Sequence, residues 1–167
     1  PAGGASALVN NLVLNGDFEN HTGAGCQYNL PSASFGTVMA NTTGFGLSNE
    51  IDVMSGACYG PLAVGGTTKL GLHTKADGSE DAFSFDLSAP VVAGVSYRLT
   101  YWALAEVSFD PSLAHVTIGL SSNPVDFGTP LHTGALTTTG VWTQFTHNFV
   151  ATLGATYLTV SSGPITT

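Results

Sequence analysis

Charged side chains are scarce in this sequence. Asp, Glu, Lys and Arg make up 8% of the 167 residues, whereas an ordinary globular chain has roughly a quarter. Cations are the scarcest, with three Lys and Arg residues against eleven Asp and Glu. Neutralising nucleic-acid phosphates or anionic lipid headgroups takes clustered Lys and Arg. We therefore expect no nucleic-acid partner, and divalent cations are the natural counterions for the acids.

The sequence also lacks any run of about 18 apolar residues, the length that a membrane-spanning helix needs. We therefore expect no membrane insertion. A chain of 167 residues can bury most of a real core, which favours one domain rather than two. The first nine residues, PAGGASALV, are mostly small, so we expect a flexible N-terminal arm over 1–9 and a single domain over 10–167.

Patterns that carry catalysis are missing as well. No G-x-S-x-G nucleophile elbow occurs, and the five histidines lie far apart without the H-x-H spacing that places two imidazoles on one metal ion. With eleven acids some glycosidase-like carboxylate pair can always be imagined, but no acid stands in a context that would raise its pKa. The sequence therefore predicts a protein that is not an enzyme.

Helical periodicity is nearly absent, and short runs of β-branched and aromatic residues are separated by Gly, Pro, Asn and Asp instead. This spacing is typical of all-β sandwiches and barrels. We expect strands near residues 11–15, 35–41, 50–54, 67–73, 81–87, 95–107, 114–120, 142–150 and 155–161. The segment 121–140 reads as a long polar loop with at most a short strand at 131–136.

The clearest strand is SYRLTYWALAEVSF, over 96–109. A period of two sends alternate side chains to opposite faces of a sheet, and both alternate sets here are largely apolar. The pattern therefore predicts a central strand of a sheet that is covered on both sides.

Cysteine is rare too, with Cys26 and Cys58 separated by 32 positions. The two alternatives are a pair of buried thiols and one disulfide, and we predict the disulfide. A disulfide implies an oxidising compartment. The chain begins at Pro1 without Met, which fits a cleaved secretory precursor, so we expect a secreted or cell-surface protein.

The segment KADGSED places three carboxylates and a glycine within seven residues. Its acids are Asp77, Glu80 and Asp81. Oxygen-rich loops of this kind bind calcium when backbone carbonyls complete the coordination shell, although the spacing differs from an EF-hand loop. The alternative is a solvated hairpin turn.

Three segments resemble the galactose-binding-like jelly rolls, a superfamily that includes carbohydrate-binding modules and domains of secreted bacterial surface proteins. LVLNGDFEN resembles the first strand and "NGxFE" turn of those domains, LSAPVVAGVSYRLTYW resembles their L-x-x-P-x-x-A-G-x-x-Y-x-L-x-x-W pattern, and GVWTQFTHNFVATLGATYLTV is similar to their later strands. The resemblance spans residues 10 to 161 and implies a jelly-roll β-sandwich of two antiparallel sheets.

The resemblance also implies a structural calcium ion, because the Glu of that turn commonly binds calcium together with an Asp on the closing strand. Glu19 matches this Glu, and Asp17 is adjacent to it. The family's closing V-D-D/N-V strand is missing, so the sheet is expected to carry an uncovered edge.

Two function classes remain. A structural or adhesive subunit would pair its free edge with copies of itself or with neighbouring surface domains, and the arm residues Ala7, Leu8 and Val9 offer an extended segment for this. A carbohydrate-binding module would instead bind glycans by stacking sugar rings on exposed aromatic side chains. The candidate residues for that binding are Trp102, Arg98, Tyr28 and Tyr59.

Overall fold

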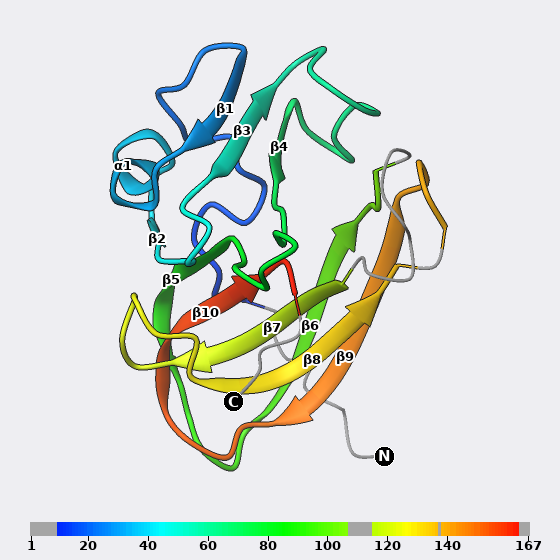
Figure 1. Cartoon of the computed structure of the whole chain (residues 1–167). Coiled ribbons are helices and arrows are strands. Elements are labelled where there is room, and N and C mark those ends of the chain that lie inside the picture. The colour runs from blue at the N-terminus through cyan, green and yellow to red at the C-terminus, as the bar shows by residue number, and fades with distance from the viewer. Residues whose placement is uncertain (1–9, 107–114, 137, 164–167) are drawn as a thin grey trace.

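A computed structural model describes residues 10–106, 115–136 and 138–163, and the described residues form ten strands and one short helix (Figure 1). The elements are β1 Cys26–Leu30, α1 Ser32–Val38, β2 Thr42–Gly44, β3 Ile51–Ser55, β4 Thr68–Gly71, β5 Ala82–Val91, β6 Ser96–Ala103, β7 His115–Ser121, β8 Thr129–Ala135, β9 Thr143–Val150 and β10 Ala155–Ser161. The N-terminal arm over 1–9 lies outside the described residues.

The named strands pair in antiparallel fashion throughout. Hydrogen bonds divide them into a five-stranded sheet with the order β2-β5-β10-β7-β8, a three-stranded sheet with the order β1-β3-β4, and a two-stranded ribbon of β6 and β9. The predicted all-β sandwich class is confirmed, with three hydrogen-bonded groups where two sheets were expected. The finer assignment to the galactose-binding-like jelly roll stays a prediction.

The five-stranded sheet is the centre of the fold, and β10 is its middle strand. β10 pairs with β5 on one side and with β7 on the other. On one face, Leu158 and Val160 pack into the main apolar core. On the opposite face, the buried Thr159 hydroxyl donates to the Phe127 carbonyl over 2.7 Å. A polar group that is buried with a partner avoids the cost of an unmade hydrogen bond, so the sheet tolerates hydroxyls on this covered face.

Aromatic rings fill the core between β5 and the short helix. Phe83 lies edge-on to Phe35 and to Phe85, with ring centroids 5.4 Å and 5.1 Å apart, and Phe18 stacks on Phe85 at 5.5 Å. Ring pairs of this geometry contribute about 0.5–1.5 kcal/mol beyond the burial of their area. The cluster therefore fixes the turn that holds Phe18 and Glu19 against the sheet.

The predicted first strand over 11–15 is reduced to an isolated β-bridge between Val13 and Leu87 of β5. Residues 12–14 pair with β5, through Leu14 N–H donating to the Asp86 carbonyl at 3.1 Å and Ser88 N–H donating to the Leu12 carbonyl at 2.8 Å. The C-terminal strand lies in the middle of the sheet, so the outer strands of this sheet among the described residues are β2 and β8.

The predicted strand over 35–41 is wrong, because Ser32–Val38 forms the helix α1. Phe35 and Met39 are both fully buried, and the Met39 N–H donates to the Phe35 carbonyl at 2.8 Å. Side chains four apart share a helix face, so burying both residues against the core favours a helical turn over a strand. The helix is too short to cross a membrane, and it is the longest helix in the part of the chain that the structure describes.

The predicted central strand is also corrected. β6 pairs with β9 alone among the described strands, and its side chains alternate between half-buried and exposed positions. Tyr97, Leu99 and Tyr101 pack toward the core. The other face carries the exposed side chains of Arg98, Thr100 and Trp102, so this face of the ribbon is not covered by another layer among the described residues.

Candidate functional site

The sequence-predicted metal residues do not gather at one place. Asp17 accepts the Glu19 N–H at 3.4 Å within the turn. Asp77 accepts the N–H and hydroxyl of Ser79 at 2.9 Å and 2.7 Å, which closes an exposed Asx-type turn. Within the described ranges no group of three or more His, Cys, Asp or Glu side chains could hold a metal ion. The calcium ion therefore stays a prediction, and of the KADGSED acids it is Asp77 that closes a turn in this structure.

Glu19 organises the start of β4. Its carboxylate accepts the Thr67 N–H at 2.7 Å, the Thr67 hydroxyl at 2.7 Å and the Thr68 N–H at 2.8 Å. These bonds lower the pKa of Glu19, with the Thr67 hydroxyl as the largest cause. A Cβ on Gly66 would lie 2.5 Å from the carboxylate. The turn thus joins the beginning of the chain to the three-stranded sheet.

The predicted calcium ion at Glu19 leads to a direct test. If an ion binds there, a chelator lowers the melting temperature of the protein, since a ligand held only by the folded state stabilises it. The Glu19→Gln variant should melt below the wild type and should not respond further to chelator. Differential scanning calorimetry with and without EDTA measures both effects, and identical wild-type curves would contradict the ion.

Asp81 is a buried hydrogen-bond centre. Its Oδ1 accepts the Ser48 hydroxyl and the Glu50 N–H, the latter at 3.1 Å, and its Oδ2 accepts the His73 N–H at 2.7 Å. The residue is 1% exposed, and burial raises the pKa of its carboxyl group. It therefore ties the loop before β3 and the end of β4 to the beginning of β5.

The predicted disulfide is present between Cys26 and Cys58, with the Cα atoms 5.6 Å apart. It joins the start of β1 to the loop over 56–66. That loop is held at two more points, by Lys69, whose ammonium donates to the Tyr59 and Pro61 carbonyls, and by the Trp142 indole N–H, which donates to the Leu62 carbonyl at 2.9 Å. A long exposed loop is thus fixed by side chains from other elements.

The candidate sugar-binding residues fall on different parts of the molecule. Trp102 and Arg98 lie on the outer face of the β6–β9 ribbon, where Trp102 is 45% exposed. Gln144 is the cross-strand partner of Trp102, and Asn148 is that of Arg98. The Arg98 Nε–H donates to the Asn148 side-chain oxygen at 3.2 Å. Tyr28 belongs to β1 in another sheet, and Tyr59 belongs to the loop over 56–66.

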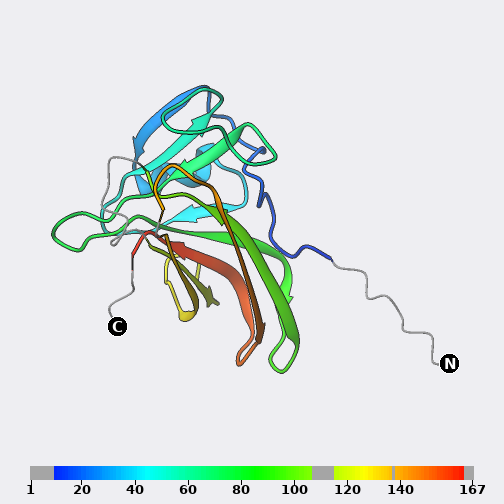
Figure 2. The same ribbon diagram turned by 90° about the vertical axis from the view of Figure 1, so that its right-hand side faces the viewer.

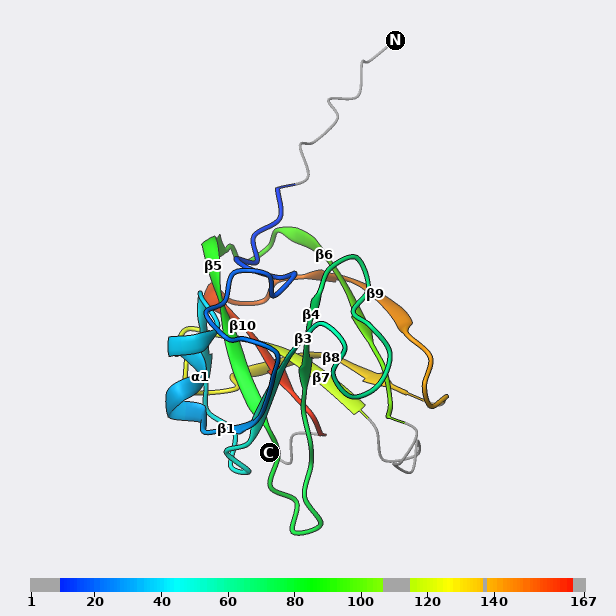
Figure 3. The same ribbon diagram turned by 90° about the horizontal axis from the view of Figure 1, so that it is seen from above.

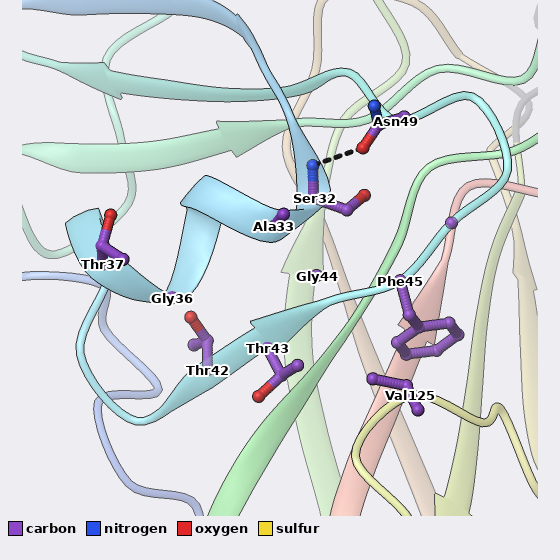
Figure 4. Close-up of a pocket in the computed structure, with 11 residues that line it drawn as sticks. Ser32, Ala33, Gly36, Thr37, Thr42, Thr43, Gly44, Phe45, Asn49 and Val125 are labelled. Carbon is purple, nitrogen blue, oxygen red and sulfur yellow. Dashed lines mark hydrogen bonds between the residues drawn. The ribbon is translucent and has the colours of Figure 1, made fainter.

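A hollow of about 590 Å³ lies between α1 and β2 (Figure 4). Its lining combines small residues and hydroxyls with Phe45, Asn49 and Val125, and it includes no ionisable side chain. Gly44 allows close approach here, because a Cβ on it would lie 2.8 Å from the Ser32 Cα atom. The hollow thus provides hydrogen-bonding groups and apolar contacts, but no side chain that could act as a general acid or base.

A larger groove of about 930 Å³ lies beside β6. Four segments line it: residues 10–13, the end of β5, the consecutive residues 96–100 of β6, and residues 148–150 of β9, with Leu120 and Leu158 contributing as well. Figure 3 shows the start of the described chain passing between β5 and β6. Most of the inner lining is apolar, and Arg98 and Asn148 stand among the polar lining residues.

A cluster of His and Tyr side chains lies between β6–β9 and β8, where the sequence spacing gave no hint of it. The rings of His132 and His147 stack with centroids 4.8 Å apart, and Tyr101 stacks on Phe145 at 5.1 Å. The His132 Nε2 atom and the Tyr101 hydroxyl are buried without a hydrogen-bond partner among the described residues. Burial raises the pKa of Tyr101 to about 12 and lowers that of His132, which the nearby His147 lowers further.

This cluster predicts a loss of stability in mild acid. The folded-state pKa of His132 lies below its unfolded value of 6.5, so the folded state takes up the proton less readily than the unfolded chain does. The stability that the protein gains by keeping His132 neutral is therefore fully present above that unfolded pKa, and it is lost as the pH falls through the lower folded-state pKa. Urea unfolding between pH 7.5 and 5.5 should show a steeper loss for the wild type than for His132→Phe. Parallel curves for the two proteins would contradict the prediction.

Comparisons with known proteins give little further identification. No protein-family model matches the chain, and no curated protein matches it. Among solved structures, it is similar to the K1 cleaved adhesin domain of Lys-gingipain (Kgp) from Porphyromonas gingivalis W83, with 17% sequence identity and a TM-score of 0.41 over 87% of this chain and 85% of that chain.

Proposed function

We propose that this protein is a non-catalytic extracellular structural or adhesive subunit that self-assembles by β-strand addition. The observation that carries the proposal is β6, a strand of eight residues whose one described partner is β9. Exposed strand edges are normally covered, charged or interrupted, because their free N–H and C=O groups pair readily with another chain. β6 carries one charged residue, Arg98, and no proline.

The surface chemistry supports the same function. Charged residues make up 8% of the chain, so a contact between copies would bury few charged side chains without a partner. The disulfide between Cys26 and Cys58 suits an oxidising, extracellular environment. Covalent fixing of loops also favours assembly, because contact surfaces that keep one shape lose less entropy on association.

Sedimentation velocity and electron microscopy test the proposal. The wild type should form oligomers or filaments in a concentration-dependent manner, and the double variant Leu8→Asp/Val9→Asp should sediment as a monomer. The variant Gly3→Asp/Gly4→Asp is the matched control, because it adds the same charge to the same segment and should still assemble. A wild type that remains monomeric at every concentration would overturn the proposal.

Glycan binding is a second candidate, favoured by the outer face of the β6–β9 ribbon. Trp102 presents an exposed ring beside Gln144, and Arg98 and Asn148 supply hydrogen-bonding groups on the same face. Sugar rings stack on such aromatic faces while amides and guanidinium groups bind their hydroxyls. On a glycan array Trp102→Ala should lose binding at least tenfold, whereas Tyr28→Ala, an equally exposed change on β1, should not. Equal binding by both variants would reject this face.

A further inference from the structure

The groove beside β6 could accept a further β-strand. Residues 96–100 of β6 line it consecutively, although neighbouring side chains of a strand point to opposite faces. Consecutive lining therefore means that the β6 backbone contributes to the groove, as the backbone of β9 does at residues 148–150. β9 pairs with β6 from Ser96 to Ala103, so the β6 edge that can accept a further strand is the one away from β9.

The opposite wall is also a piece of extended backbone. Residues 10–13 line the groove consecutively, and residues 12–14 are paired with β5 on their other side. Below these two walls lie apolar side chains from both layers of the sandwich: Leu87, Val91, Leu99, Leu120, Phe149 and Leu158. The groove thus combines a hydrogen-bonding edge with an apolar floor, which are the two features that bind an added strand.

One end of the molecule leaves further apolar side chains in solvent beside the groove. The β5–β6 and β9–β10 turns lie side by side there (Figure 2), joined by Gly94 N–H to the Ala151 carbonyl at 2.8 Å and Ala151 N–H to the Val95 carbonyl at 3.0 Å. Val92, Val95 and Val150 are each between 44% and 57% exposed. An occupant that leaves the groove at this end would cover them.

We propose that this groove is the acceptor site for the arm of a second copy, with Ala7, Leu8 and Val9 added as a strand along β6. The inference rests on the proposed function and names the surface that it uses. The arm is uncharged and carries small residues before Leu8 and Val9, so an extended backbone can approach β6 closely while Leu8 reaches the apolar floor. Nine extended residues span roughly 30 Å, which is enough to reach a neighbouring molecule.

The direction of the chain at the groove favours a second copy over the same molecule. The Asn11 side-chain oxygen accepts the Val13 N–H at 3.1 Å, and the Leu12 carbonyl accepts the Ser88 N–H at 2.8 Å. These bonds fix residues 11–13 along the groove wall. To fill its own groove the arm would have to reverse direction at Asn10, immediately beside this fixed segment.

Disulfide trapping in the full chain tests the acceptor. The native cysteines are bonded to each other, so introduced thiols are the reactive ones. With Leu8 on the apolar floor, Val9 of the added strand faces the same side as Thr100. Val9→Cys is therefore combined with Thr100→Cys beside the groove or with Thr133→Cys, an exposed position on β8 at the far edge of the five-stranded sheet. After mild oxidation, Val9→Cys/Thr100→Cys should give a reducible ladder of multimers at least tenfold more abundant than the Thr133 combination or Val9→Cys alone gives.

Each other outcome has a defined meaning. A ladder from the Thr133 combination in place of the Thr100 combination would overturn the groove as acceptor and leave the proposed self-assembly standing. Closure within one monomer, seen as loss of both introduced thiols without a ladder, would assign the groove to its own arm and overturn the exchange between copies. Sedimentation of the untreated wild type as a monomer, together with no ladder, would overturn the proposed function itself.

Discussion

Asp81→Ala is expected to lower the free energy of unfolding by about 3–5 kcal/mol. The substitution removes the acceptor of the Ser48 hydroxyl and of the Glu50 and His73 N–H groups, and it does so at a position that is 1% exposed. A buried donor that loses its partner costs about 1–3 kcal/mol, and the three losses overlap because the loops can relax together. The total free energy of unfolding of a domain is about 5–15 kcal/mol, so the substitution removes a large share of it.

Urea denaturation followed by tryptophan fluorescence measures this effect. Asp77→Ala is the matched control, because it also replaces an Asp by Ala in the same segment. Asp77 lies in an exposed turn, and water can replace it as the partner of the Ser79 N–H and hydroxyl groups. The midpoint should fall strongly for Asp81→Ala and little for Asp77→Ala, with similar slopes. Equal midpoints for the two variants would show that the Asp81 network contributes no more than a surface turn.

Removing the disulfide is the second large expected effect, at about 3–4 kcal/mol for a loop closed across 32 positions. The double variant Cys26→Ser/Cys58→Ser frees the unfolded chain and also releases β1, which has five residues and no fully buried side chain. β1 is one outer strand of the three-stranded sheet, so its release should be local.

Hydrogen exchange with mass spectrometry distinguishes a local release from a global one. Protection should fall in residues 26–30 and 56–66 and should persist in β10 and β5. Variants that lose the hydrogen bonds from Lys69 or Trp142 to the loop over 56–66 are the control for the double variant, because they free the same loop without freeing β1. An unchanged urea midpoint in the double variant would contradict the expected stabilisation.

Most strands were predictable because their apolar residues repeat with a period of two. β5, β7, β9 and β10 fall close to the expected segments, and β8 occupies the position where a short strand was expected. β1 was not predicted, since CQYNL is largely exposed and an exposed strand leaves no hydrophobic pattern. α1 was mistaken for a strand because Phe35, Thr37 and Val38 are strand-forming types; the Phe35 to Met39 spacing was the available signal.

The candidate site could be predicted only in part, for a physical reason. The Cys26–Cys58 pairing was predictable because two cysteines allow one pairing. The His132 and His147 stack and the groove beside β6 depend on how separate sheets pack, and they join residues that are far apart in the chain. Sequence spacing describes one element at a time, so it cannot show which edge of a strand remains without a neighbour.

The central position of β10 has a consequence for the order of events during synthesis. Ser161 pairs with Ala82 and with Thr117, so the five-stranded sheet cannot form until the chain has been made almost to its last described residue. At about 5–20 residues per second, β5 waits on the order of ten seconds for its neighbour. During that time Phe83 and Phe85 can pack only on rings made before them, such as Phe35 and Phe18, and pairing across such sequence distance is slow in itself. The nascent chain therefore emerges without its five-stranded sheet and with apolar side chains of β5 and β7 uncovered, a form that chaperones bind and that a narrow export channel can accept.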